Sequence, residues 1–349
     1  MKNCFRLLGL LALAFGLLVA PGCRTAPRTF THRKGDEIVV AGQLFHTGTR
    51  VITWMDPNGY DAYRIERRFS RYEESSWGKT VETGKGPTVP NRYSLRASGL
   101  TPEQIERVRG GGWDLPALQQ VVDQFVIHYD AAGISKTCFK ILHDMRGLSV
   151  HFLLDVDGTV YQTLDLKERA WHATSSNDRS IGIEIANLGA YQPAKAQILE
   201  EWYPRDAQGR PVLQVPAKIG DPMIYRKDYV VRPARPELIR GNVQGTDLVQ
   251  YDYTPAQYAA LVKLTAALCK LFPRIACDYP RDADGKLVLK KLPDETLKTF
   301  GGVIGHFHIQ TNKVDPGPAF QWDWVIEGAR RELGLRPIAP RRAAARWSL

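Results

Sequence analysis

The segment 302–320, with the sequence GVIGHFHIQTNKVDPGPAF, constrains this chain more than any other part of it. It brings two histidines, a lysine and an aspartate into one short run that ends in Pro-Gly-Pro. The prolines fix φ and remove backbone donors, while the glycine between them permits unusual dihedral angles. We therefore expect a stiff, non-helical loop that presents imidazole and carboxylate groups. Such a loop is half of a metal site, and the other half must lie upstream.

The start of the chain, MKNCFRLLGLLALAFGLLVAPGC, has the form of an export signal. Its apolar run is too short for a comfortable membrane span and follows a basic start, so we expect residues 1–22 to be a signal peptide. The end of this segment resembles a bacterial lipobox, in which Cys23 would carry the lipid. Arg24 then favours an outer-membrane anchor, with residues 23–36 as a periplasmic tether. A plain signal peptide with an incidental cysteine is the alternative.

Composition describes an ordinary soluble globular protein, with 44% hydrophobic and 24% charged residues among 349. The net charge is +10, and loss of Lys2 and Arg6 with the signal leaves 10 − 2 = +8. This excess suits an anionic partner such as a cell wall, lipid headgroups or nucleic acid. Basic repeats interleaved with aromatic residues are not evident, so we expect no nucleic-acid partner.

Outside the export segment the chain has three cysteines, Cys138, Cys269 and Cys277. They form no C-x-x-C pattern, which argues against a cysteine-ligated metal. Cys269 and Cys277 are near enough in sequence to pair in an oxidising compartment. Two free buried thiols are an equal expectation.

Strand-like and helical runs along the chain predict an α/β fold. The run 121–129, VVDQFVIHY, suits a buried strand that ends near His128. An Asp-Gly turn at 157–158 joins two further strand-like runs. In SIGIEIAN, residues 180–187, the isoleucines alternate with smaller or polar residues, so Glu184 should face away from the helix-covered core. Amphipathic helices are expected over 254–271 and 322–333.

Two regions give weaker signals. Residues 37–115 form an N-terminal extension to which the sequence assigns no role. Residues 190–253 are rich in proline and mixed in charge, and we interpret them as an insertion that forms loops beside the cleft. The main domain then covers 116–335, and 336–349 is a basic tail.

Five motifs together resemble the zinc-dependent N-acetylmuramoyl-L-alanine amidases of type 2, which share their fold with peptidoglycan recognition proteins and the phage T7 lysozyme. The motifs are VIHY at 126–129, GLSVHFLLDVDGTVYQ at 147–162, RAWHA at 169–173, SIGIEIAN at 180–187 and GHFHIQTNKVDPGPAF at 305–320. The resemblance runs from about residue 121 to 328, interrupted by the insertion. It implies a zinc amidase fold for the main domain, with a central mixed β-sheet flanked by helices.

The resemblance also implies roles for individual residues. His128, His306 and Asp315 match the ligands of one Zn²⁺, an open site in which a bound water has its pKa lowered to about 7. His308 is a rival to His306, since the family commonly has a small acidic residue there.

Glu184 matches the general acid/base and Lys313 the lysine that stabilises the oxyanion. Trp171 and His172 match a pair that lines the substrate cleft. Whether His172 binds a substrate carbonyl or only packs there is open.

The activity implied is hydrolysis of the amide between N-acetylmuramic acid and L-alanine in peptidoglycan or its fragments. One alternative is a peptidoglycan-binding module without catalysis. Another is an amidase restricted to 1,6-anhydro muropeptides during wall recycling. The expected partners are a muropeptide substrate and, through the lipid anchor, a membrane.

Overall fold

The computed structural model describes residues 33–64, 66–70, 93–97, 100–109 and 112–338. The chain divides into a unit of residues 1–33 and a unit of residues 34–349, and the second unit holds every element described below. The predicted signal peptide, Cys23 and most of the tether lie outside the described residues, as does the tail beyond residue 338. Within the described part, no helix combines the length and apolar character needed to cross a membrane.

A six-stranded mixed sheet forms the centre, as the sequence predicts. Its order is β12 (Gly302–Gly305), β5 (Gln124–Tyr129), β9 (Ser180–Ile185), β6 (Phe152–Leu154), β7 (Val160–Gln162) and β3 (Val51–Thr53). Neighbouring strands are parallel except β6 and β7, which form the antiparallel hairpin expected from the Asp-Gly turn. Because β5, β9 and β12 run in the same direction, the residues that follow them meet at one edge of the sheet.

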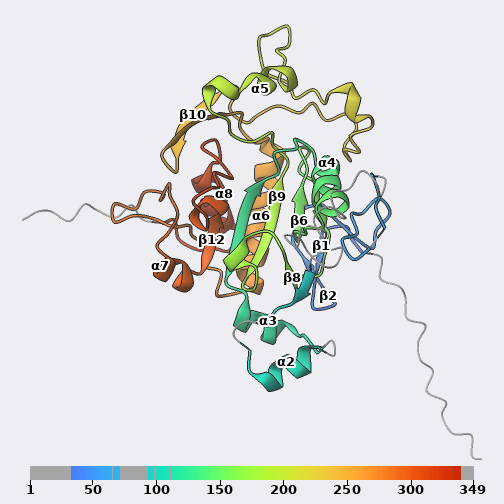
Figure 1. The fold of residues 1–349 in the computed structure, drawn as a ribbon, viewed down its shortest axis with the longest axis vertical. Coiled ribbons are helices and arrows are strands. Elements are labelled where there is room, and N and C mark those ends of the chain that lie inside the picture. Colours follow the sequence, from blue (N-terminus) through green and yellow to red (C-terminus); the bar gives the residue numbers. More distant parts are fainter. Residues whose placement is uncertain (1–32, 65, 71–92, 98–99, 110–111, 339–349) are drawn as a thin grey trace, which may run out of the picture. The chain divides into compact units, whose positions relative to one another are not determined.

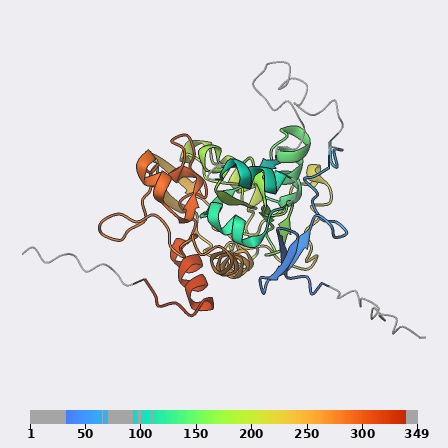
Figure 2. The ribbon, with the colours of Figure 1, turned by 90° about the horizontal axis from the view of Figure 1, so that it is seen from below.

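One face of the sheet is covered by the two longest helices, α6 (Pro255–Leu271) and α8 (Trp322–Glu332). The three isoleucines of β9 pack on this side with Leu261 and Leu264 of α6 and with Val325 of α8. Thr254 caps α6 through a reciprocal capping box with Gln257. Figure 1 shows α6 behind the central strands, and Figure 2 shows α6 and α8 together on one side. Both predicted helices are confirmed.

The opposite face carries the polar side chains. Residues alternate between faces along a strand, so His128 and Glu184 share this side with Leu153 and Tyr161. Part of it is covered by α4 (Ser135–Phe139), which continues as a π-helical turn over Lys140–Met145. The remaining part stays open, and the candidate site lies there.

The described residues of the N-terminal segment 37–115 pack into the main domain. It contributes β3 to the central sheet, a separate hairpin and a strand that pairs with β8. The further elements of this segment are β1 (Glu37–Val40), β2 (Gln43–His46), β4 (Tyr93–Leu95), α2 (Pro102–Arg109) and α3 (Leu115–Val121), which begins at its end. The partner of β4, β8 (Glu168–Ala170), belongs to the main domain. This part of the chain is therefore structural, which its sequence does not reveal.

Residues 190–253 contain a helix and a hairpin in addition to the predicted loops. They form α5 (Gln197–Trp202) and a hairpin of β10 (Ile239–Val243) and β11 (Thr246–Gln250). Their apolar cluster includes Trp202 and Tyr251 and extends to Leu188, just beyond β9. In Figure 1 this yellow-green segment lies across one end of the central strands. The remaining elements are α7 (Asp294–Thr299) and 3₁₀ turns at Thr174–Ser176, Pro193–Lys195, Ala217–Ile219 and His306–His308.

Candidate active site

Three buried side chains from distant parts of the sequence converge at the edge of the sheet. Nδ1 of His128 lies 3.0 Å from Nδ1 of His306 and 2.9 Å from Oδ2 of Asp315. The third side of the triangle, from His306 Nδ1 to Asp315 Oδ2, is 3.0 Å. Each residue is at most 7% exposed. The structure thus brings together the three residues that the sequence predicts as metal ligands.

Strand register explains this convergence. Gly305 at the end of β12 pairs with Ile127 of β5, so the next residues along the two strands are His306 and His128. The loop after β12 then returns, and the Phe307 amide donates to the Asp315 carbonyl oxygen. Because parallel strands end at the same edge, two histidines far apart in sequence become neighbours. The Pro-Gly-Pro run supplies the stiff return that carries the aspartate.

The donor set fits a divalent metal ion. Two imidazole nitrogens and one carboxylate oxygen are the kind of set that holds catalytic zinc, and a tetrahedral ion with bonds of about 2.0–2.2 Å separates its ligand atoms by roughly 3.3 Å. The observed separations of 2.9–3.0 Å are slightly shorter than this. Small side-chain shifts would therefore admit the ion.

The protonation states of His128 and Asp315 also favour metal binding. Burial lowers the pKa of His128 to about 4, and the nearby His306 adds to the effect, so its imidazole is neutral at pH 7. Burial alone would raise the pKa of Asp315, but the adjacent imidazoles of His306 and His128 hold it well below its ordinary value. Neutral imidazole and ionised carboxylate are the forms that bind metals.

The far nitrogens of both histidines are held by neighbours. Nε2 of His306 donates to Oε1 of Gln310 at 2.6 Å, which leaves Nδ1 with a free lone pair facing the cluster. Nε2 of His128 lies 3.0 Å from Nδ1 of His172. The other nitrogen of His172 lies 3.2 Å from Ser180 Oγ. Such partners fix the tautomer and orientation of metal-binding histidines.

Glu184 and Lys313 line the same cavity, of about 870 Å³, as the three converging residues. Glu184 is the register partner of His128 on the adjacent strand, and its Oε2 is buried without a hydrogen-bond partner. Burial raises the pKa of Glu184 well above its ordinary value, with a further contribution from Asp315. A carboxyl group with a raised pKa and a free oxygen can exchange protons near neutral pH.

The cavity continues past Trp171, whose side chain is 38% exposed. The Arg169 guanidinium lies 4.6 Å from the centre of the Trp171 ring system, which holds the indole at the rim. An exposed aromatic beside an open cavity gives a surface on which a substrate can pack. The predicted substrate residues thus separate, with Trp171 at the rim and His172 against His128.

Comparison with known families agrees with this geometry. Residues 118–210 match the sequence model of the family described as N-acetylmuramoyl-L-alanine amidase. The match includes His128, Trp171, His172 and Glu184, and it ends before the loop that carries His306. No match is found among curated proteins.

Three solved structures of amidases are similar to parts of the chain. A selenomethionine derivative of AmpD has 19% identity and a TM-score of 0.30 over 60% of this chain and 86% of its own. AmiD from E. coli, in complex with anhydro-N-acetylmuramic acid-L-Ala-D-gamma-Glu-L-Lys, has 20% identity and a TM-score of 0.33 over 59% and 57%. The endolysin LysCS from Clostridium intestinale has 15% identity and a TM-score of 0.30 over 63% and 88%.

His308, the rival to His306, lies outside the cluster. It is fully buried, its Nδ1 accepts from the Gly305 amide at 3.0 Å, and its Nε2 donates to the Val288 carbonyl at 2.7 Å. Both ring nitrogens of His308 therefore hold the start of the loop that follows β12. The geometry favours His306 as the ligand.

A second group of potential ligands lies on the β1–β2 hairpin. The donor atoms of Asp36, Glu37 and His46 are within 4.8 Å of one another. The carboxylates already accept hydrogen bonds from the backbone amides of residues 34, 35 and 48, and Asp36 pairs with His46 at 2.8 Å. We interpret this group, in which Glu37 is buried and His46 exposed, as a set of contacts that stabilises the hairpin. None of the three residues lines the cavity of Glu184 and Lys313.

Two residues of the candidate active site were not predicted from the sequence. Gln310 lies four positions after His306, a spacing that could have suggested contact across one turn. A glycine two positions before Glu184 could leave room for substrate, but a Cβ at Gly182 would lie 2.5 Å from the His172 ring. It therefore makes room for the side chain that supports His128. No feature of the sequence distinguishes these two uses of a glycine.

Proposed function

We propose that this chain hydrolyses the amide bond between N-acetylmuramic acid and L-alanine of peptidoglycan, with Zn²⁺ held by His128, His306 and Asp315. The observation that supports this proposal most directly is the buried cluster of two histidine Nδ1 atoms and one aspartate oxygen beside Glu184. When bound there, zinc would supply a Lewis acid for the scissile carbonyl and lower the pKa of a water molecule.

Glu184 performs the proton transfers in this proposal. Its free Oε2 takes a proton from the attacking water and passes it to the departing nitrogen of L-alanine. The raised pKa of Glu184 suits a group that must both accept and release a proton. The neighbouring carboxylate of Asp315 contributes to that raised pKa, so the ligand and the base are electrostatically linked.

Lys313 stabilises the charge that develops on the carbonyl oxygen. Its side chain lines the cavity two residues before Asp315 on the same stiff loop. A positioned cation at a developing oxyanion contributes about 3–4 kcal/mol to transition-state stabilisation. Trp171 at the rim offers an apolar surface to the sugar or stem peptide.

The same side chains argue against a binding module without catalysis. All three ligand positions, the acid/base and the lysine are filled and meet in one cavity. The geometry does not separate intact wall from 1,6-anhydro fragments, so the proposed substrate class is the shared muramoyl-L-alanine amide.

The proposed location is the periplasm, with a lipid on Cys23 anchoring the protein to the outer membrane. The sequence Ala-Pro-Gly-Cys after a basic and apolar leader supports this. Metabolic labelling with palmitate tests it. Label should enter the wild-type protein and be absent from Cys23→Ala, and equal labelling of both would contradict the proposal.

The activity is tested by incubating zinc-loaded protein with intact sacculi and, separately, with 1,6-anhydro muropeptides. Mass spectrometry should show stem peptides with a free L-alanine amino group from at least one substrate. A chelator should abolish their release and zinc should restore it. Binding of both substrates without release would instead support the non-catalytic module.

A further inference from the structure

The β10–β11 hairpin of the insertion contacts the ligand loop, defined here as residues 306–315, through one side chain at its tip. Nε2 of Gln244 donates to the carbonyl oxygens of Phe307 and Gln310, both at 2.8 Å, and lies 3.5 Å from that of Lys313. Oε1 of Gln244 accepts from the Lys291 amide at 3.1 Å. One amide group therefore joins three points along the loop to a further segment of the chain.

The contacted carbonyls adjoin the active groups. Phe307 follows His306, Gln310 accepts the hydrogen bond that orients the His306 ring, and Lys313 is the proposed oxyanion residue. Gln244 itself is not among the residues that line the active-site cavity. Its influence must therefore pass through the loop backbone.

The backbone at the tip indicates that the Gln244 side chain is specifically needed. Gln244 and Gly245 both have positive φ, at 57° and 75°, as in a two-residue hairpin turn of type I′. Asn or Gly is strongly preferred in such turns, and any other residue is conformationally unfavourable there. A glutamine at this position offsets that cost through the hydrogen bonds of its side chain.

The far end of the same hairpin holds the segment that directly follows the ligand loop. Gln250, fully buried, donates from Nε2 to the Pro316 carbonyl at 3.1 Å and accepts from the Ala319 amide at 3.0 Å. Gly317 allows this approach, since a Cβ there would lie 2.3 Å from Gln250 Oε1. The hairpin thus grips the segment on both sides of Asp315.

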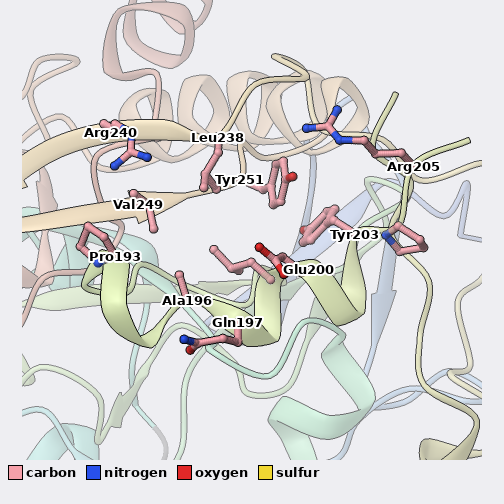
Figure 3. A pocket seen from close by; sticks show the side chains of 12 residues that line it. Pro193, Ala196, Gln197, Glu200, Tyr203, Arg205, Leu238, Arg240, Val249 and Tyr251 are labelled. Atoms are coloured by element: carbon pink, nitrogen blue, oxygen red, sulfur yellow. The ribbon is translucent and has the colours of Figure 1, made fainter. Parts of the chain in front are cut away.

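The two faces of the hairpin have different surroundings. Gly241 and Gln250 face the Pro-Gly-Pro segment, and a Cβ on Gly241 would lie 2.6 Å from Pro318. On the opposite face, Arg240 and Val249 line a separate cavity against α5, shown in Figure 3. One face of the hairpin therefore packs against the Pro-Gly-Pro segment, and the other face lines the cavity beside α5.

We propose that Gln244 is a positioning residue, by which the insertion holds His306 and Lys313 in the geometry needed for metal binding and turnover. This inference rests on the proposed function for its effect on turnover. Its effect on metal affinity is independent of the reaction. In this arrangement a neutral amide donor fixes the backbone carbonyls of the loop, and the side chains of that loop bind the metal and stabilise the oxyanion.

The test distinguishes the effect of the Gln244 side chain from the effect of the turn conformation. Gln244→Asn and Gln244→Gly keep or improve the type I′ turn but remove the amide from reach of the loop. We expect the thermal midpoint to stay within a few degrees of wild type. The zinc dissociation constant should rise about tenfold or more, and zinc-saturated kcat should fall about tenfold with little change in KM.

Asn242→Ala is the matched control, because Asn242 lies on the same hairpin and its side chain donates to Asp247 across it at 2.8 Å. Its zinc affinity and kcat should equal those of wild type. Zinc affinity and kcat within twofold of wild type in both Gln244 variants would overturn the proposal. So would unfolding of those variants, or equal losses in Asn242→Ala, since either shows general stability rather than positioning. If wild type binds zinc but hydrolyses nothing, the proposed function fails and the affinity comparison still tests Gln244.

Discussion

Glu184 lies directly beside His128, because the two residues are register partners on the adjacent parallel strands β9 and β5. Both side chains stand on the open face of the sheet, and the isoleucines that flank Glu184 along β9 pack on the other. The strand pairing therefore sets a carboxyl group next to the ligand cluster without any loop to position it. A site built on strands is held more rigidly than one built on loops.

Glu184→Gln should separate metal binding from turnover. The amide keeps the size of the side chain and cannot accept a proton, so we expect kcat to fall by about 10²–10⁴-fold. Zinc content should remain that of wild type, because Glu184 is not a ligand. Steady-state hydrolysis and elemental analysis on the same sample measure both. Turnover within tenfold of wild type would refute its role as acid/base.

Gly182→Ala should weaken metal binding although residue 182 contacts no ligand. The new Cβ would displace the His172 ring, and with it the partner of His128 Nε2. Loss of such a partner typically costs 10–100-fold in metal affinity. Competition titration with a chromogenic zinc chelator measures the change.

A double variant provides the control for this prediction. In His172→Ala the ring is absent, so adding Gly182→Ala should produce little further loss. Losses that simply multiply in the double variant would show that Gly182 acts by some route other than the His172 ring.

His308→Ala should reduce stability and leave zinc stoichiometry unchanged. The substitution removes both hydrogen bonds of a fully buried ring and leaves the Gly305 amide without its acceptor. We expect a loss of about 2–4 kcal/mol in the free energy of unfolding. Urea denaturation of the zinc-free protein gives the stability, and elemental analysis gives the metal. Loss of zinc at temperatures where the variant remains folded would restore His308 as a ligand.

Asp155→Asn should change the pH dependence of stability. Burial raises the pKa of Asp155 from 3.8 to about 7, and the charge of Asp157 adds to this. Between about pH 4 and 7 the folded protein therefore holds a proton that the unfolded chain has released, so wild-type stability falls as pH rises through this window. The asparagine carries no such proton.

The stability of Asp155→Asn relative to wild type should consequently increase from pH 4 to pH 8 by up to ~4 kcal/mol. Denaturant unfolding at the two pH values measures the difference. The same relative stability at both values would mean that Asp155 ionises normally in the folded protein.

Much of the fold and the site follows from local pattern. The alternation of isoleucines in β9 correctly places Glu184 away from the helices, and the cap at Thr254 marks the start of α6. The His-x-His and Asp-Pro-Gly-Pro run identifies the returning loop. These features depend on neighbouring residues, whose spacing the sequence displays directly.

The contacts that position the site residues could not be predicted from local sequence pattern. His128 Nε2 meets His172, and Gln244 reaches a loop more than sixty positions further on, through pairings that depend on the assembled sheet. The insertion was expected to form loops beside the cleft, yet its hairpin packs against the ligand loop. Polar residues such as Gln244 carry no periodic signal, because their partners are backbone carbonyls rather than a patterned apolar face.

The most direct test of the central claim is a crystal structure of zinc-soaked protein with anomalous data collected at the zinc absorption edge. The account predicts one strong peak within about 2.0–2.2 Å of Nδ1 of His128, Nδ1 of His306 and a carboxylate oxygen of Asp315. The absence of a peak there, or zinc bound only at Asp36 and His46, would contradict it.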